Sequence, residues 1–193
     1  MGFWDSVLGR TKPTGPNLDA LFALPSAAIT LQTSLDMLPT GRGSVAFRAP
    51  EGRAFADVEA DVRSLLDAGG GQPVEVAPDA YGFTWLVTTT EPADVGQAVT
   101  DVHAVNTSLV DAGFGPQLLC SLVSFRDPSG NALAMVYLFK RGTFYPFAPV
   151  GDPATTEQRD NVLEIRVRDL LLRELPLEED LTRWFPVWGA PGL

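Results

Sequence analysis

Residues 113–149 read GFGPQLLCSLVSFRDPSGNALAMVYLFKRGTFYPFAP, the densest apolar stretch of the chain, and we expect the rest of the fold to pack around it. Two runs rich in Leu, Val, Phe and Tyr, Gln117–Phe125 and Ala132–Phe139, flank the turn-forming cluster Arg126–Asn131 and predict a β-hairpin. Both faces of the first strand are apolar, so it should lie inside a sheet that is covered on both sides. One face would carry Leu119, Val123 and Phe125, and the other Leu118, Cys120 and Leu122. A third strand over Thr143–Phe147 contains a proline that cannot donate a ladder hydrogen bond, which favours a sheet edge or a departing loop.

The composition is typical of a soluble globular protein. The chain has 193 residues, 45% of them apolar, which suits one domain or two small ones. Its formal net charge is −10, and no Lys or Arg occurs between Ser64 and Phe125. Binding of nucleic acid by counterion release needs a clustered basic face, so we exclude this class of partner. The single cysteine, and the absence of an N-terminal apolar stretch long enough for a signal peptide or membrane span, predict a cytoplasmic protein.

Residues 1–16 are expected to form an amphipathic arm and linker. Phe3 and Trp4 share helical spacing with Val7 and Leu8. One interpretation is a short helix over residues 2–10 that lies on the inner face of a membrane or in a partner's groove. The alternative is a frayed terminus or a staple on its own domain. A helix of about ten residues is marginal in water, so membrane contact through this arm alone should be weak.

The first half of the domain is predicted to contain a short helix, a hairpin and a longer helix. The short helix covers Leu18–Leu24 and would end at Pro25. Alternation over Ala27–Leu35 indicates a strand, which turns at Pro39–Gly43 and returns over Ser44–Arg48. The helical stripe that follows is formed by Phe55, Val58, Val62, Leu65 and Leu66.

A second hairpin and helix precede the central stretch. Val74 to Val87 reads as two strands joined through Pro78–Gly82, and Thr90 with Pro92 opens a helix that Gly113 ends. The buried stripe of this helix is expected at Val95, Val99, Val102, Val105 and Leu109.

A third helix is predicted after the central stretch. Thr155 and Gln158 have capping-box spacing, and Leu163 and Val167 can share a face with later leucines. Alternation of Leu163, Ile165 and Val167 with charged residues would also fit a half-exposed strand. We favour the helix because the apolar run continues to Leu175. Hairpin followed by helix is thus repeated, which predicts a single α+β domain over residues 17–175: a two-layer antiparallel sheet of roughly six to seven strands, with helices mainly on one face.

The tail, residues 176–193, holds two of the four tryptophans, Trp184 and Trp188, in an irregular segment. Tryptophan side chains seldom remain in water, so we expect the tail to dock on the sheet. The alternative is that the tail binds a partner protein. The aromatic loop at Phe144, Tyr145 and Phe147 is its expected internal counterpart.

The sequence offers little catalytic chemistry. His103 is the only histidine and Cys120 the only cysteine, so we expect no metal site and no cofactor. His103 flanks a helical stripe, which favours a structural or surface histidine, and burial should make Cys120 inert. Asn106 should be buried and tie its helix to the sheet. We therefore predict no catalytic residues, with an unrecognised enzyme as an alternative.

Five blocks of the sequence carry a family resemblance that spans essentially the whole chain. They are MGFWDSVLGR (residues 1–10), PNLDALFALP (16–25), AGFGPQLLC (112–120), YLFKRGTFYPF (137–147) and RWFPVWGAPG (183–192). Together they make the sequence similar to the PspAB family, proteins associated with phage-shock protein A in envelope stress. The resemblance implies a cytosolic accessory protein of a membrane-stress system, with a membrane zinc protease as a candidate further partner. It implies no catalytic residues.

The leading hypothesis is a non-enzymatic adaptor that binds a protein partner through aromatic side chains on its surface. The candidates are Phe3, Trp4, Phe144, Tyr145, Trp184 and Trp188. The second hypothesis is a membrane-surface sensor that uses residues 2–10.

Overall fold

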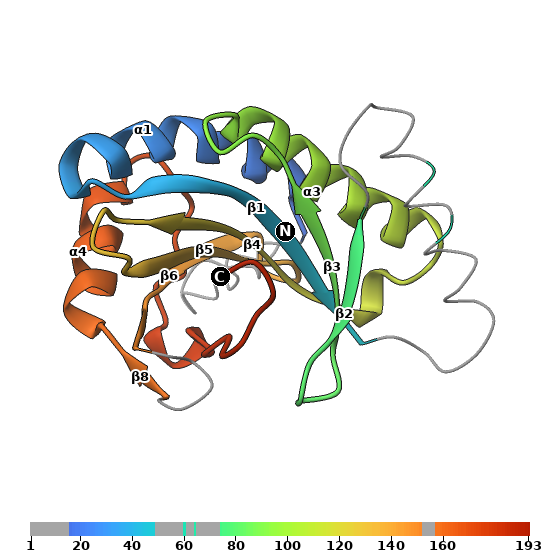
Figure 1. Ribbon diagram of the computed structural model, residues 1–193. Helices are drawn as coiled ribbons and strands as arrows, with labels where there is room; N and C mark the ends of the chain where they lie inside the picture. Colours follow the sequence, from blue (N-terminus) through green and yellow to red (C-terminus); the bar gives the residue numbers. More distant parts are fainter. Residues whose placement is uncertain (1–15, 49–59, 61–63, 65–73, 152–156) are drawn as a thin grey trace, which may run out of the picture.

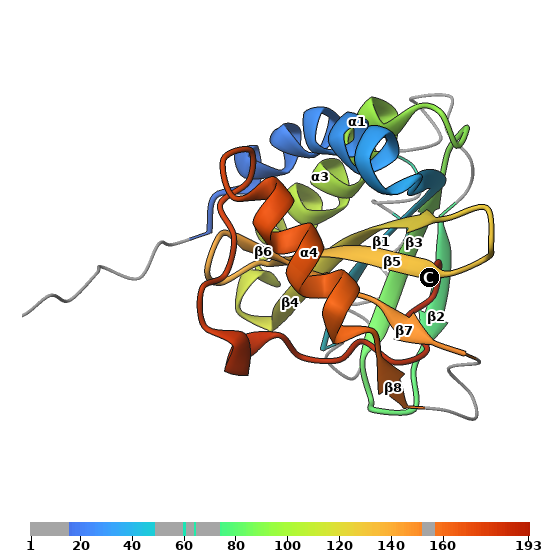
Figure 2. The ribbon, with the colours of Figure 1, turned by 90° about the vertical axis from the view of Figure 1, so that its left-hand side faces the viewer.

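The computed structural model describes residues 16–48, 60, 64, 74–151 and 157–193. A six-stranded antiparallel sheet, in the order β2-β3-β1-β4-β5-β6, runs through the middle of the molecule. Helices α1 and α3 cross one face, α4 lies near the β6 edge, and the C-terminal tail crosses the opposite face (Figures 1 and 2). This arrangement confirms the predicted α+β fold with a sheet of six strands.

The first elements differ from the prediction. Leu18–Ala23 form a 3-10 helix, η1, and Leu24–Leu35 form α1. Pro25 lies in the first turn of α1, where its missing N–H has no partner to lose, so it begins this helix instead of ending the previous one. The predicted strand over Ala27–Leu35 is therefore wrong. Its apparent alternation is the helical stripe of buried residues Leu24, Ala27, Ala28 and Leu31.

Among the described residues, one helical stretch, Leu18–Leu35, is apolar and long enough to span a membrane, with a mean hydropathy of 1.2. This corrects the expectation that no such stretch exists near the N-terminus. Its apolar stripe nevertheless packs into the protein core, and Thr30 on its outer side donates a hydrogen bond of 2.8 Å to Glu174. The buried residues of this stretch, 28% of its length, therefore belong to the core, and the others are exposed or half-buried.

Strand β1, Leu38–Phe47, is continuous, so the predicted turn at Pro39–Gly43 is also wrong. The pairing of β1 with β4 is irregular between Pro39 and Gly43, which accommodates the proline and glycines as a bulge. Gly43 allows close packing instead of a turn, since a Cβ atom there would lie 2.5 Å from a methyl group of Val102 on α3. The predicted return strand is the second half of β1. The predicted helical stripe from Phe55 to Leu66 lies outside the described residues.

The other predicted hairpins and helices are confirmed. Strands β2 (Glu75–Pro78) and β3 (Thr84–Thr89) pair, and α3 (Val95–Asp111) follows with Asp94 as its N-cap. The central stretch forms β4 (Leu118–Arg126), β5 (Ala132–Leu138) and the edge strand β6 (Thr143–Phe147). A separate pair, β7 (Pro149–Val150) and β8 (Gln158–Arg159), precedes α4 (Asn161–Leu171).

Helix α4 settles the alternative of strand or helix over Leu163–Val167 in favour of the helix. Its N-cap is Asp160, whose carboxylate accepts the Leu163 N–H at 2.9 Å, and not the predicted Thr155, which lies outside the described residues.

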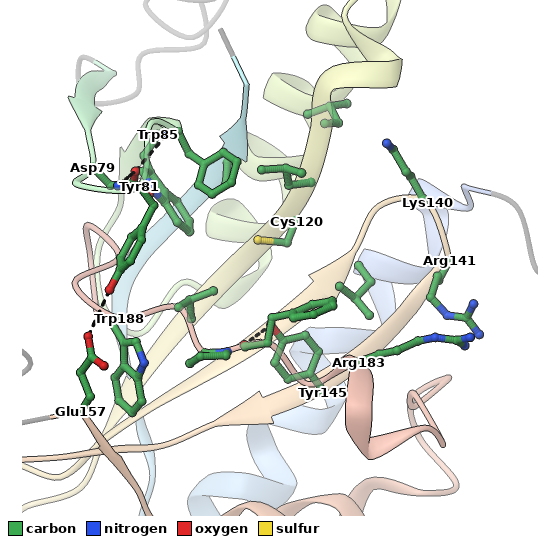
Figure 3. A pocket seen from close by; sticks show the side chains of 18 residues that line it. Asp79, Tyr81, Trp85, Cys120, Lys140, Arg141, Tyr145, Glu157, Arg183 and Trp188 are labelled. Atoms are coloured by element: carbon green, nitrogen blue, oxygen red, sulfur yellow. Dashed lines mark hydrogen bonds between the residues drawn. The ribbon is translucent and has the colours of Figure 1, made fainter.

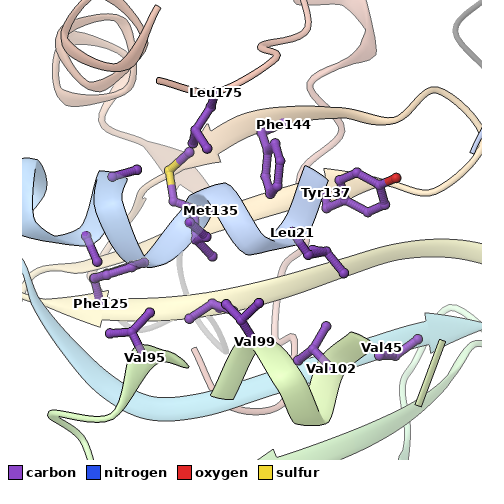
Figure 4. Close-up of a cluster of buried hydrophobic side chains, with 14 of the residues drawn as sticks. Leu21, Val45, Val95, Val99, Val102, Phe125, Met135, Tyr137, Phe144 and Leu175 are labelled. Carbon is purple, nitrogen blue, oxygen red and sulfur yellow. The ribbon is translucent and has the colours of Figure 1, made fainter. Parts of the chain in front are cut away.

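The helix face of the sheet carries the larger core. Side chains of η1, α1 and α3 interlock there with alternate residues of the strands, as Figure 4 shows for Leu21, Val99 and Met135. On β4, Val123 and Phe125 face the helices, while Cys120 and Leu122 face the tail. Leu118 and Leu119 lie on the faces opposite to those predicted, because the β1–β4 register shifts next to them, between Ala46 and Phe47.

The tail continues the sheet before it crosses the second face. Phe144 donates its N–H to Pro176 O at 2.8 Å and accepts the Glu178 N–H at 2.7 Å, which forms a parallel bridge at Leu177. These bonds cover the exposed edge of β6, the kind of edge that otherwise invites pairing with another chain.

Candidate functional site

The tail is held on the sheet by its two tryptophans. Trp184 is 5% exposed, lies parallel to the Tyr145 ring at 6.0 Å between centroids, and donates its indole N–H to Glu178 O at 3.0 Å. Tyr145 in turn donates its hydroxyl to Phe185 O at 2.7 Å. Trp188 meets the Phe147 ring edge-on at 4.9 Å. These contacts make the tail one wall of a groove.

The groove lies between the tail and the β2–β3 hairpin and has a volume of about 650 Å³ (Figure 3). Its floor is the tail face of the sheet and includes Ala46, Trp85, Cys120 and Leu138. The side walls are Tyr81 and Phe83 from the hairpin, and Phe185, Pro186, Val187 and Trp188 from the tail. Concave, mostly apolar sites of this size are typical of ligand pockets.

One end of the groove is built around Asp79. Its carboxylate accepts the backbone N–H groups of Tyr81 and Phe83, both at 2.8 Å, and the indole N–H of Trp85 at 2.9 Å. The hairpin turn therefore holds Trp85 in place on the floor. Across the groove mouth, the Tyr81 hydroxyl donates to Glu157 at 3.2 Å, and this hydrogen bond raises the pKa of Tyr81.

The other end is basic and is organised by the buried carboxylate of Glu178. Arg141 Nε and the Thr143 hydroxyl both donate to it, the latter at 3.0 Å, and Arg183 Nη1 lies 3.7 Å away. Arg183 also pairs with Asp180 at 3.4 Å. Lys140 completes this end and makes no ion pair with any other described residue. Figure 3 shows the three cationic side chains on the side away from Asp79 and Glu157.

Cys120 lies between these ends, on the floor. Burial raises the pKa of its thiol to about 12, and the nearby Asp79 charge adds to the rise. A thiol in this environment stays protonated at neutral pH, which agrees with the predicted inertness. Its side chain is therefore part of an apolar surface and does not act as a nucleophile there.

With this geometry in place, the comparisons with known proteins place the chain. The family model described as PspA associated protein B matches residues 1–192. The chain belongs to the PspAB family. No curated protein and no solved structure matches it. The PspAB description links the chain to PspA, so a PspA-related protein partner follows from membership.

In this PspAB chain, the predicted partner-binding residues fall into three groups. Phe3 and Trp4 lie outside the described residues. Phe144, Tyr145 and Trp184 were expected on the surface, but all three are buried. Phe144, on β6, belongs to the core on the helix face, whereas Tyr145 and Trp184 cover each other where the tail docks on β6. Trp188 is half-buried and lines the groove.

Two other polar residues singled out from the sequence have structural contacts. Asn106 is buried and donates its amide to Val102 O at 2.8 Å and to the Ser121 hydroxyl at 2.7 Å, which confirms that it ties α3 to β4. His103 contacts the Phe22 ring at 4.9 Å and lies 3.8 Å from Asp19, away from the groove. Within the described part of the chain, no group of three or more His, Cys, Asp or Glu side chains could hold a metal ion.

The sequence patterns did not predict the groove. Asp79, Tyr81 and Trp85 were assigned only to a hairpin, and Lys140 and Arg141 only to a turn. One signal was present: the tail face of β4 is apolar although no helix was predicted to cover it. A face of this kind needs a partner, and the tail provides only part of that cover.

Proposed function

We propose that the chain is a non-enzymatic adaptor of a PspA-type envelope stress response, acting in the cytoplasm at the inner face of the membrane. Its partner is a protein of that system that presents an apolar segment, either PspA itself or a membrane zinc protease. The rim of the groove is the docking surface in this proposal.

The observation that carries the proposal is a set of apolar side chains left in solvent beside the groove. Phe185 is 59% exposed and Leu181 is 49% exposed, and both lie on the docked tail. Tyr81 stands on the facing hairpin and is 57% exposed. Large aromatic and aliphatic side chains on a rigid support are the usual anchors of protein interfaces. Family membership supplies the link to PspA.

Rigid presentation supports this choice of surface. Asp180 accepts the Thr182 N–H at 3.0 Å and caps the short helix η3 (Leu181–Arg183), which orients Leu181. The Tyr145 hydroxyl holds the Phe185 carbonyl. A surface that is ordered before binding loses less conformational entropy when the partner arrives.

The test is a pull-down from envelope-stressed cells that compares wild type with the double variant Leu181→Ser, Phe185→Ser. Loss of an interface anchor of 2 kcal/mol or more lowers affinity roughly 30-fold, so recovery of PspA-linked proteins should fall to background. Val162→Ser is the matched control, because Val162 is 80% exposed on α4 and outside the groove lining. Equal recovery of the same partners by all three proteins would refute the proposed surface.

The membrane-surface alternative depends on residues 2–10, which lie outside the described residues, and stays a prediction. Flotation of the wild-type protein with liposomes, compared with Trp4→Asp, tests it. Wild-type protein that stays at the bottom of the gradient would rule it out.

A further inference from the structure

The interior of the groove differs from its rim. Inside, the accessible side chains are almost entirely apolar, from Trp85, Leu119 and Leu138 on the sheet to Val187 and Trp188 on the tail. Polar groups gather at the two ends. Such a site favours a ligand with a long apolar part and a polar group at one end.

Size restricts the occupant. An α-helix with its side chains is about 10–12 Å wide and rises 5.4 Å per turn, so two turns fill roughly 850–1,200 Å³. The groove holds about 650 Å³. An extended hydrocarbon chain needs far less of this volume than a helix with its side chains, so it suits the groove better.

Charge determines which way such a ligand would lie. At the basic end, Arg141 and Arg183 pair with the carboxylates of Glu178 and Asp180, and Lys140 adds a positive charge that has no ion pair with another described residue. Both arginines are tied to these carboxylates, so the exposed ammonium of Lys140 is the free group. Asp79 and Glu157 lie at the opposite end and would repel an anion. An anionic head group is therefore directed to Lys140.

The floor is suited to hydrocarbon. Cys120 has an uncharged thiol, and Ala46 leaves space beside it because its side chain is small. The polar atoms that approach the floor already have partners, since Asp79 accepts three hydrogen bonds, one of them from the Trp85 indole. A hydrocarbon chain would leave these buried groups satisfied, which is the condition for favourable burial.

We propose that the groove binds an anionic single-chain amphiphile, with its acyl chain on the floor between Trp85 and Leu138 and its carboxylate or phosphate beside Lys140. A free fatty acid and a lysophospholipid share this chemistry. The inference goes beyond the adaptor role and concerns the purified protein alone, so either proposal can fail without the other.

The experiment titrates the full-length protein with three probes, each kept below the concentration at which it aggregates, and follows binding by tryptophan fluorescence and calorimetry. Palmitate and 1-palmitoyl-lysophosphatidate test the two sources of the anion, and hexadecanol has the chain without the charge. We expect saturable one-to-one binding of at least one anionic probe, at least tenfold tighter than hexadecanol. The anion that binds tighter identifies the source.

Variants separate the groove from other surfaces. Lys140→Glu should weaken binding of the anionic probe on the order of tenfold or more. Arg173→Glu is the matched control, because it reverses an exposed cation outside the groove lining, and it should leave binding unchanged. Val187→Trp should fill the groove and abolish binding, whereas Val162→Trp on α4 should have no effect.

Circular dichroism of each variant shows whether it is folded, and Lys140 is exposed, so its reversal leaves the core intact. Absence of saturable binding by the wild type would overturn the proposal. Probe binding that survives both Lys140→Glu and Val187→Trp would also overturn the proposal. The same holds if the groove binds a partner peptide and neither anionic probe.

Discussion

Replacement of Trp184 by alanine tests the contact on which the groove depends. The indole is almost fully buried against Tyr145, and its N–H is satisfied by Glu178 O. A tryptophan buries about 150–250 Å² of surface, and Trp→Ala changes in a packed core cost about 3–5 kcal/mol. We expect a loss of that size if the tail and the domain unfold together.

Two measurements distinguish the possible outcomes. Urea unfolding followed by circular dichroism gives the free energy of unfolding, and limited proteolysis followed by mass spectrometry reports whether the tail is cut first. If the tail detaches locally, the global loss is smaller but cleavage within residues 176–193 accelerates. Trp184→Phe is the matched control, because it keeps an aromatic ring against Tyr145 but loses the hydrogen bond. It should lower the free energy of unfolding by about 1–2 kcal/mol.

The result that would refute this reasoning is a Trp184→Ala protein whose unfolding free energy lies within 0.5 kcal/mol of wild type and whose tail resists protease as before. The tail would then contribute nothing to stability, and the groove would lose one of its walls.

Three further predictions rest on packing and burial. Gly43→Ala should destabilise the protein by about 1–3 kcal/mol in urea unfolding, because its Cβ would meet a Val102 methyl group at 2.5 Å. Gly96→Ala on α3 should instead stabilise it by about 0.5–1 kcal/mol, because its Cβ would meet only the Asp94 carboxylate, at an ordinary 3.5 Å. Equal effects of the two changes on stability would contradict the packing. Burial raises the pKa of Glu164, so its contribution to stability is present below the unfolded pKa of about 4.3 and is lost as pH rises through the folded pKa. The difference in unfolding free energy between wild type and the less stable Glu164→Gln should therefore become smaller from pH 4 to pH 7. A difference that grows over this range would contradict the argument. Burial raises the pKa of Cys120 to about 12, so its thiol should react with a disulfide reagent at pH 8 on the order of 1,000-fold more slowly than an exposed cysteine. Unfolding in urea should remove this difference in rate. Fast reaction of the native protein would show that the thiol is accessible to solvent.

Local sequence patterns predicted the elements whose signals lie within a few residues. The hairpin of β4 and β5 was found from two apolar runs around Arg126–Asn131, and α3 from its apolar stripe and the glycine that ends it. The error over Ala27–Leu35 has a local cause as well. Pro25 is compatible with both the end and the first turn of a helix, and only packing against α3 distinguishes the two.

The candidate site was less predictable, because its parts come from distant segments. Asp79, Cys120, Lys140 and Trp188 line one groove only after the tail has crossed the sheet. Nothing in their immediate neighbours marks them as a set. The same limit explains Phe144 and Tyr145, since an aromatic residue in an edge strand looks alike in sequence whether it awaits a partner or is covered by its own chain.

By itself, the sequence determined the α+β class, the central hairpin, the tie from Asn106 to the sheet, and membership of the PspAB family. Those properties depend on the order of residues within short segments, or on a direct comparison of the sequence with those of a family. The tertiary structure alone decided which aromatic side chains are buried, which charge sits at which end of the groove, and that a cavity exists at all. Burial and charge proximity depend on distances through space, and a chain that folds back on itself sets those distances independently of residue number.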